Sequence, residues 1–342
     1  MVKVLVVDDS SFMRISLKHI LESDKSIGVV GTAADGEDAI RQVKQLHPNV
    51  VLLDIEMPGM DGLATLAHIM AECPTPVLML SGLNKRDTTI AIKSLDNGAV
   101  DFIPKPSGVI SFDIDELSHE ITTKVKIAAN AKVHKVDLRL PKESYQRRRP
   151  KLETRKGIIV IGASTGGPGA VATILSGLPR DISTAIIVVQ HMSPEFVPSF
   201  VERLQWGCSL KISTARRGEI ISAGRALIAP GGRNTVIVQN GDARKIRFNR
   251  KAAPHGSFPC VDYAMESVAN VYGEGALGVL LTGVGRDGTA GMKAIRNAGG
   301  STIAQDESSC VVFGMPKAAI EARCVDEIVP LPQIAQTILR MI

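Results

Sequence analysis

Carboxylates stand where two strands of the sequence are predicted to end. Asp8 and Asp9 follow the apolar run Val2–Val7, and Asp54 follows Val50–Leu53. Sites in open α/β sheets form at the carboxyl ends of strands, so these three side chains are expected to lie together. Carboxylates brought together repel one another and need a cation, and oxygen ligands that leave room for water suit Mg²⁺. The pattern therefore predicts a Mg²⁺ site.

Two more polar residues follow predicted strands and would complete a site for a phosphoryl group. Ser81 comes after Pro76–Leu80, and Lys105 lies just beyond Ala99–Ile103. The lysine would offset the charge of the phosphoryl group, the serine hydroxyl could hydrogen-bond it, and Asp54 could accept it as an aspartyl phosphate. Each residue alone could be a helix cap or a turn residue. Their occurrence at four strand ends favours the site.

A serine motif opens the second half of the chain. Ser164 is the centre of a G-x-S-x-G pattern between the apolar run Gly157–Ile161 and a predicted helix, which is the context of a nucleophile elbow. The N–H of Thr165 could then point at an oxyanion. The glycine-rich loops Gly162–Gly169 and Gly283–Gly291 also permit a module that binds a phosphate or a sugar, although neither loop carries a P-loop or G-x-G-x-x-G pattern.

A serine nucleophile needs a base and an acid that orients the base. His191 follows the predicted strand Thr184–Val189, and we favour it over His255, which lies in a loop. Asp287 comes after the predicted strand Ala276–Leu281. The remaining rival acids, Asp262 and Asp306, are expected to lack such a strand-end position. The chain order Ser, His, Asp differs from that of α/β-hydrolases, which indicates a separate scaffold.

Short apolar runs alternate with helical patterns along the chain, which predicts an α/β protein with two doubly wound parallel-sheet domains. The first half repeats the strand–helix pair five times. The second half restarts that pattern and includes a hairpin signal over Thr235–Asn249 around Asn240-Gly241. We place the domains at 1–122 and 155–342, joined by a linker at 123–154.

Composition narrows the class of protein further. No apolar run reaches the roughly 18–20 residues that span a bilayer, and the N-terminus lacks a signal-peptide pattern, so we expect a cytoplasmic protein without direct membrane insertion. The five cysteines form no C-x-x-C pair. Residues 124–156 hold twelve Lys and Arg against three acidic residues, while the rest of the chain is net negative. The basic segment is therefore interpreted as a solvated linker rather than as a nucleic-acid-binding face.

Residues 1–122 resemble the receiver domain of bacterial response regulators. The resemblance implies a flavodoxin-like fold and Asp54 as phospho-acceptor, with Mg²⁺ held by Asp8, Asp9, Asp54 and the backbone carbonyl of Glu56. It implies contacts from Ser81 and Lys105 to the phosphoryl group. Phe102 stands at the position of an aromatic switch that is often Tyr in the family. The phosphodonor would be a phosphohistidine on a partner kinase.

The second half resembles the protein-glutamate methylesterase of bacterial chemotaxis (the CheB family). Four motifs carry the resemblance: Gly162–Pro168, Gln190-His191-Met192, Leu281–Gly288 and Val312–Lys317. The resemblance implies a Rossmann-like domain that removes methyl esters from glutamates of methyl-accepting chemoreceptors and deamidates receptor glutamines, without a cofactor in the esterase site.

The same resemblance implies roles for single residues. Ser164 is expected to be the nucleophile, His191 the base and then acid, and Asp287 the orienting acid. The oxyanion donors would be the N–H groups of Thr165 and Val284. The family usually has Met where this chain has Val284 and His where it has Asn234. A backbone donor survives the first change, and the effect of the second on substrate contacts stays open.

The arrangement of the two halves predicts regulation. A receiver docked over the catalytic cleft would inhibit the enzyme, and phosphorylation of Asp54 would shift the population toward an open form. Isolated 155–342 should then be faster than the unphosphorylated full chain. Two alternatives stay open: a response regulator whose second half only binds a partner or a phosphorylated ligand, and an effector that binds nucleic acid through the basic linker.

Overall fold

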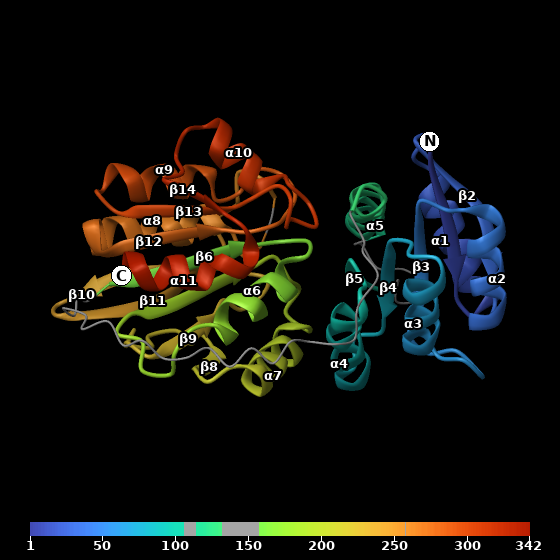
Figure 1. The fold of residues 1–342 in the computed structure, drawn as a ribbon, viewed down its shortest axis with the longest axis horizontal. Helices are drawn as coiled ribbons and strands as arrows, with labels where there is room; N and C mark the ends of the chain where they lie inside the picture. The colour runs from blue at the N-terminus through green and yellow to red at the C-terminus, as the bar shows by residue number, and fades with distance from the viewer. Residues whose placement is uncertain (106–113, 132–156, 257) are drawn as a thin grey trace.

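The computed structural model describes residues 1–105, 114–131, 157–256 and 258–342. These residues form two α/β domains (Figure 1). Of the predicted linker 123–154, only residues 123–131 lie within these ranges. The elements of the first domain are β1 (Val2–Val7), α1 (Ser11–Glu22), β2 (Ile27–Ala33), α2 (Gly36–Leu46), β3 (Val50–Asp54), α3 (Gly62–Glu72), β4 (Val77–Ser81), α4 (Lys85–Ser94), η1 (Leu95–Asn97), β5 (Asp101–Pro104) and α5 (Ile114–Ala128).

The first domain is a five-stranded parallel sheet in the order β2-β1-β3-β4-β5. This is the order expected for a flavodoxin-like fold. Strands β3 and β4 are buried along their whole length, which explains their continuous apolar sequence. Helix α5 runs past the predicted boundary at residue 122, because Val125 and Ala128 are buried against the sheet.

The second domain contains a seven-stranded parallel sheet in the order β14-β13-β12-β6-β7-β9-β8. Its elements are β6 (Ile158–Ala163), α6 (Gly167–Ser176), β7 (Ala185–Gln190), α7 (Val197–Gly207), β8 (Lys211–Thr214), β9 (Arg225–Ile228), β10 (Asn234–Asn240), β11 (Ala243–Asn249), α8 (Val261–Tyr272), η2 (Gly273–Gly275), β12 (Ala276–Leu280), α9 (Thr289–Asn297), β13 (Ser301–Gln305), α10 (Met315–Glu321), β14 (Glu327–Val329) and α11 (Leu331–Met341). The predicted antiparallel hairpin is present as β10 and β11.

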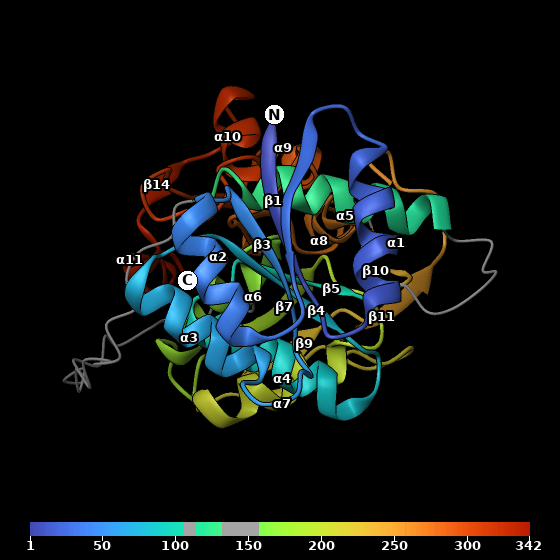
Figure 2. The same ribbon diagram turned by 90° about the vertical axis from the view of Figure 1, so that its right-hand side faces the viewer.

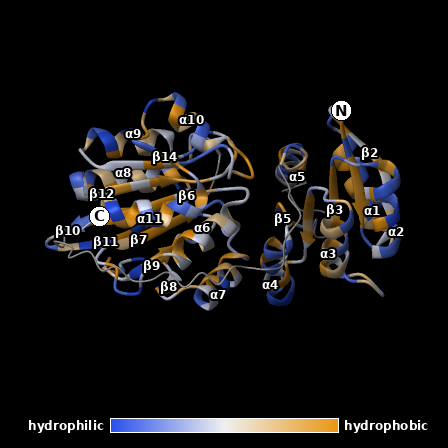
Figure 3. Ribbon diagram, in the orientation of Figure 1, coloured by the Kyte–Doolittle hydropathy of each residue, from blue (hydrophilic) through white to orange (hydrophobic). Residues whose placement is uncertain are grey.

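Two layers of helices cover the second sheet, and Figure 3 shows its strands as the most apolar part of the domain. Apolar residues of α6, α7 and α11 belong to a cluster with one face of β6 and β7. Those of α8, α9 and α10, together with the hairpin, belong to a cluster with the opposite face. Both faces of the sheet are therefore buried, as in other doubly wound folds.

The order in which strands are added to this parallel sheet changes side between β6 and β12. After β6 the chain adds strands on one side of the sheet, and it then returns to add β12, β13 and β14 on the other. The loops that follow β6 and β12 therefore flank a topological switch point, which is where open α/β sheets form their sites. Figures 1 and 2 show that this edge of the second domain faces the first domain.

The helices contain no candidate for a membrane span. Within the described ranges, none combines the length and the apolar character that crossing a bilayer requires.

Candidate active site

Ser164 lies in the tight turn between β6 and α6. Its N–H donates to the carbonyl of Thr282 (3.0 Å), which ties the turn to the loop after β12. Gly166 adopts a positive φ of 75°, which glycine tolerates and which lets the chain enter the helix at once. Gly283 packs directly on the serine, since a Cβ at that position would lie 2.6 Å from the Cβ of Ser164. Small residues thus make room for the serine, as the motif predicted.

His191 and Asp287 meet at the same edge of the sheet. His191 directly follows β7, and its Nε2 lies 2.8 Å from Oδ2 of Asp287. Asp287 is buried and receives backbone N–H bonds of 2.8 Å from Val261 and 2.9 Å from Asp262, the first two residues of α8. Burial alone would raise the pKa of Asp287, but the contacts with His191 and these N–H groups lower it to about 2. Asp287 is therefore an ionised acceptor at neutral pH.

The two expected oxyanion donors are uncommitted. Within the parts of the chain that the structure describes, the N–H groups of Thr165 and Val284 donate no hydrogen bond. The loop that carries Val284 is held from behind, because the carbonyl of Gly283 accepts bonds from Gly314 (3.1 Å) and Met315 (2.9 Å). In the same described residues, the Ser164 hydroxyl has no hydrogen bond to His191; such contacts are often long before substrate binds.

The first domain gathers its polar residues at the carboxyl ends of β1, β3 and β5. Lys105 Nζ lies 2.7 Å from Oδ1 of Asp54 and 3.1 Å from Oδ2 of Asp8. Burial raises the pKa of Asp54 to about 6, although Lys105 opposes this shift. Ser81 is buried at the end of β4, but its hydroxyl donates to the carbonyl of Gly82 (2.8 Å) rather than to Asp54.

The same pocket has the donors that a hard divalent cation requires. Carboxylate oxygens of Asp8, Asp9 and Asp54 lie within 4.8 Å of one another. Oδ2 of Asp54 is buried and has no hydrogen-bond partner among the described residues. Oxygen donors of this kind suit Mg²⁺, so the residues fit the ion, with the carbonyl of Glu56 as the further expected ligand.

Comparison with known proteins assigns both halves. Residues 159–338 match the family model described as CheB methylesterase, and residues 4–120 match the response regulator receiver domain. A protein of Symbiobacterium thermophilum named protein-glutamate methylesterase/protein-glutamine glutaminase is 44% identical, with 100% of this chain and 97% of that protein covered. The chain belongs to the CheB methylesterase family.

Two further comparisons agree with this assignment. A Pseudomonas aeruginosa protein named protein-glutamate methylesterase/protein-glutamine glutaminase 2 is 43% identical over 99% of this chain and 96% of its own length. The crystal structure of the Thermotoga maritima CheB methylesterase catalytic domain matches 55% of this chain and 100% of that chain, with a TM-score of 0.54 and 34% identity. The chain is therefore a hydrolase of the CheB family with a receiver domain, and the predicted fold class is confirmed.

In this CheB-family chain the receiver contacts the loop of the serine. Asp101 on β5 accepts a hydrogen bond of 3.2 Å from the hydroxyl of Thr165, the residue after Ser164. Its neighbour Phe102, the expected switch residue, is buried and stacks on Phe196 of the catalytic domain, with ring centroids 4.3 Å apart. Phe102 thus lies in the interface between the domains.

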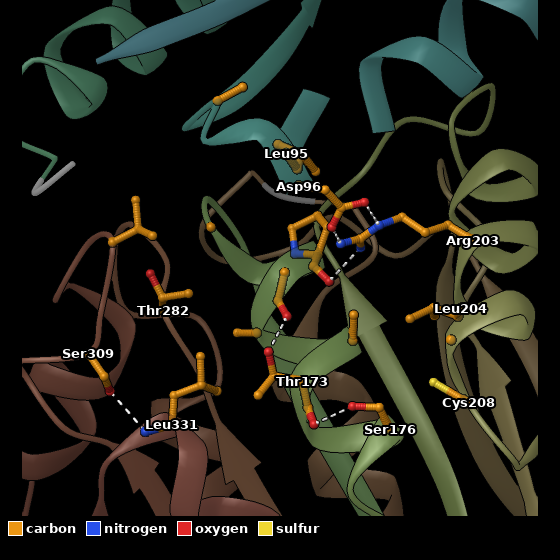
Figure 4. A pocket seen from close by; sticks show the side chains of 18 of the residues that line it. Leu95, Asp96, Thr173, Ser176, Arg203, Leu204, Cys208, Thr282, Ser309 and Leu331 are labelled. Atoms are coloured by element: carbon orange, nitrogen blue, oxygen red, sulfur yellow. Dashed lines mark hydrogen bonds and ion pairs between the residues drawn. The ribbon is translucent and has the colours of Figure 1, made fainter. Parts of the chain in front are cut away.

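Contacts from α4 and η1 complete this interface. Thr88 and Ser199 share a buried hydrogen bond of 2.9 Å. Asp96 and Arg203 form a two-bond ion pair, drawn with dashed lines in Figure 4. Beside them lies a cavity of about 720 Å³ whose walls come from both domains and include Thr282. The interface is therefore specific at its polar contacts and incompletely filled between them.

The rival base and the rival acid of the sequence analysis pair with each other. His255 Nε2 lies 3.6 Å from Oδ2 of Asp262, and Asp262 accepts the N–H of Gly291 (2.8 Å). The expectation that Asp306 lacks a strand-end position is wrong, because Asp306 directly follows β13. Its carboxylate instead accepts bonds from Ser308 and Ser309 within its own turn.

Asn234 binds the loop and the helix end next to Asp287. It is fully buried, so it cannot contact a substrate directly. Its side chain donates to the carbonyl of Lys251 (2.8 Å) and accepts the N–H of Cys260 (3.0 Å), the residue that precedes α8. Cys260 in turn contacts Asp287. Asn234 therefore joins the hairpin to the helix end that holds Asp287.

Sequence reasoning missed two parts of this site. The first is the N-terminus of α8, whose Val261 and Asp262 N–H groups hold Asp287. The second is the side chain of Gln190, which binds the backbone of Ser164 and of His191. A signal for Gln190 was present, because it directly precedes the histidine at a strand end. No local pattern marks the helix end, since it lies far from Asp287 along the chain.

Proposed function

We propose that this hydrolase demethylates glutamate methyl esters of chemoreceptors through Ser164, His191 and Asp287. The observation that carries the proposal is the 2.8 Å pair of His191 with an ionised Asp287, at the same sheet edge as a serine flanked by uncommitted N–H groups. This is the set of groups that acyl transfer requires: a nucleophile, an oriented base and donors for an oxyanion.

The first half of the reaction forms an acyl-enzyme. Oγ of Ser164 attacks the ester carbonyl carbon of the glutamate side chain while His191 takes the hydroxyl proton. The negative charge on the ester oxygen is met by the N–H groups of Thr165 and Val284. The intermediate then loses methoxide, which leaves as methanol after it receives the proton from His191. Asp287 stays ionised and stabilises the imidazolium.

The second half restores the enzyme. A water molecule attacks the acyl carbonyl as His191 removes its proton, and the proton passes to Oγ of Ser164 when the acyl bond breaks. The products are a free glutamate carboxylate and the original serine. A glutamine side chain would react by the same steps and release ammonia, which accounts for a glutaminase activity of one site.

We propose that the receiver is phosphorylated on Asp54 by a chemotaxis histidine kinase. Bound Mg²⁺ would neutralise charge on the phosphoryl group and on the carboxylates. Lys105, which already lies 2.7 Å from Asp54, would pair with the new phosphoryl oxygens, and Ser81 could turn its hydroxyl toward them. Both residues lie on or next to the elements that face the catalytic domain.

We further propose that phosphorylation relieves inhibition by the receiver. The catalytic domain is contacted by α4, η1 and β5, which adjoin the phosphorylation pocket, and Asp101 binds the residue beside the nucleophile. In this closed arrangement the receiver lies against the residue next to the serine, where it would hinder the approach of a receptor segment. A phosphoryl group that moves the side chains of Lys105 and Ser81 would shift the positions of these same elements. That shift would favour the open form.

The experiment is methanol release from methylated receptor membranes by the full chain, with and without Mg²⁺ and a small-molecule phosphodonor. Ser164→Ala should remove release, whereas Ser176→Ala, in which a hydroxyl bonded within α6 is lost, should behave as wild type. Release that rises with the donor supports both sites and their coupling. A Ser164→Ala protein that stays active would refute the proposed nucleophile, and folded wild type without release would favour a binding module.

The location of the protein and its remaining partners stay predictions. A cytoplasmic enzyme would meet the cytoplasmic ends of its receptors without inserting into the membrane, and we propose no nucleic-acid partner. Strongly salt-dependent DNA binding by the full chain would contradict that last statement.

A further inference from the structure

The buried amide of Gln190 lies at the site and has no task in the proposed mechanism. Gln190 is the last residue of β7, and it is 4% exposed. Its Nε2 donates to the carbonyl of Ser164 (2.8 Å) and to the carbonyl of His191 (3.1 Å). Both N–H bonds of a single amide group are thus spent on the backbone of the proposed nucleophile and of the proposed base.

We infer that Gln190 is a positioning residue of the esterase that aligns and polarises the oxyanion-binding peptide. The carbonyl of Ser164 and the N–H of Thr165 belong to the same planar peptide group. A bond that fixes the carbonyl therefore fixes the direction of the N–H as well. This inference rests on the proposed function, because it requires the Thr165 N–H to be an oxyanion donor.

The carbonyl of Ser164 receives a second bond that strengthens the effect. The N–H of Gly167 donates to it at 2.7 Å, so that this one carbonyl oxygen has two donors. Hydrogen bonds in a chain polarise one another, by about 10–30% for each bond. Electron density drawn toward the Ser164 oxygen leaves the Thr165 N–H a better donor. The amide of Gln190 therefore increases the pull on an oxyanion before any substrate is bound.

The oxygen end of the Gln190 amide indicates that packing alone does not explain why this residue carries an amide. Oε1 of Gln190 is buried without a hydrogen-bond partner among the described residues. A buried acceptor without a partner destabilises the folded state, and a methionine of similar shape would not carry that cost. Gly167 makes the space for this amide, because a Cβ there would lie 2.2 Å from Oε1. The site thus accommodates an amide whose oxygen is unpaired and whose nitrogen holds two backbone carbonyls.

The bond to His191 gives Gln190 a second alignment role. The N–H of His191 donates to the carbonyl of Ala163 (3.0 Å), and its carbonyl accepts from Gln190. The backbone of the base is therefore held on both sides to the segment that carries the nucleophile. A shift of about 1 Å between reacting groups can cost a hundredfold in rate, so this alignment adds to the effect on the oxyanion.

The test compares Gln190→Met with Gln205→Met in the full chain. Gln205 also donates through Nε2 to a carbonyl, that of Ile212 (2.8 Å), but it lies at the end of α7, so the same chemical change is made away from the serine. Removal of one oxyanion donor costs about 10²–10³ in kcat, and a positioning residue should cost less. We expect Gln190→Met to lower kcat about tenfold to a hundredfold with KM changed less than about twofold.

A second readout follows the serine without the natural substrate. The rate of Ser164 phosphonylation by a fluorophosphonate, whose phosphoryl oxygen occupies the oxyanion site, should fall in parallel with kcat. Ser164→Ala should be inactive in both assays. If it stays active, the proposed nucleophile is wrong; if it is inactive while Gln190→Met matches Gln205→Met, the inference about Gln190 is wrong and the proposed function stands.

A measurement on the wild type covers the case in which Gln190→Met does not fold. A scalar coupling across the hydrogen bond, between ¹⁵Nε2 of Gln190 and the carbonyl ¹³C of Ser164, should be present in labelled full-length protein. Its absence while the couplings of the β7 backbone are resolved would overturn the inference.

Discussion

Removal of one carboxylate from the receiver should activate the unphosphorylated enzyme. Asp96 on η1 binds Arg203 on α7 through both carboxylate oxygens, with Nε to Oδ2 at 3.0 Å. In Asp96→Ala both of these bonds to Arg203 are lost, and no residue of the catalytic domain is changed. Arg203→Ala would be a poorer test, because that guanidinium also donates to the carbonyl of Pro168 (3.2 Å) within its own domain.

The size of the effect follows from the exposure of the pair. The Arg203 side chain is 16% exposed and that of Asp96 is 57% exposed, so water and salt screen one partner. Exposed pairs contribute about 0–1 kcal/mol, and a two-bond arginine–carboxylate geometry lies at the upper end of that range. About 1 kcal/mol moves a two-state equilibrium roughly fivefold. Basal methanol release should therefore rise about fivefold, toward the phosphorylated rate as a ceiling.

The assay is methanol release from methylated receptor membranes without a phosphodonor, at low and at high salt. Glu72→Ala is the control, since it breaks an exposed receiver ion pair with Lys44 that does not reach the catalytic domain. The rate of phosphorylated Asp96→Ala should equal that of phosphorylated wild type. A basal rate that stays within twofold of both wild type and Glu72→Ala, while the phosphodonor still activates wild type, would refute the closed interface as the inhibited state.

Three shorter predictions address the two sites and the fold. Gly283→Ala should abolish esterase activity in a folded protein, because the new Cβ would lie 2.6 Å from Ser164 Cβ; methanol release and a thermal melt check this. Asp54→Asn should keep the basal rate and remove the response to a phosphodonor. Burial raises the pKa of Asp262 to about 6. The folded state therefore favours the protonated carboxyl, and this contribution to the free energy of unfolding is fully present below about pH 4 and is lost as pH rises through 6. Asp262→Asn should therefore raise the free energy of unfolding by about 1–2 kcal/mol at pH 8 and leave it nearly unchanged at pH 4, measured by urea denaturation.

The sequence was most informative where local patterns and topology agree. The apolar run before Ser164 and the run before His191 were identified as strands, and parallel strands place their carboxyl ends at one edge. The register of β6 with β7 sets Ala163 opposite Gln190, so the serine and the histidine follow neighbouring strand ends. The position of each residue thus follows from rules that a single sequence obeys.

Contacts between distant segments could not be predicted in this way. The Asp287 carboxylate is held by N–H groups of Val261 and Asp262. The sequence of a helix N-terminus does not predict which distant side chain will bind to it. Strands β8 and β9 have only four residues each and lie at one side of the sheet, so their patterns were too short to recognise. Asp306 was excluded on position, whereas its bonds to the neighbouring serines are what separate it from the site.

The contacts around two successive peptide groups of the serine loop suggest where regulation and catalysis meet. Gln190 holds the carbonyl of Ser164, and the hydroxyl of Thr282 donates to the carbonyl of Thr165 (3.0 Å). From the opposite domain, Asp101 accepts the hydroxyl of Thr165. On the proposed mechanism, the receiver therefore acts on Thr165, whose N–H meets the oxyanion, while the His–Asp pair stays intact. Because that pair is held by the N-terminus of α8, which the receiver contacts leave untouched, the base stays aligned in the closed form. Opening then requires the release of β5 from the serine loop together with the loss of the α4 and η1 contacts.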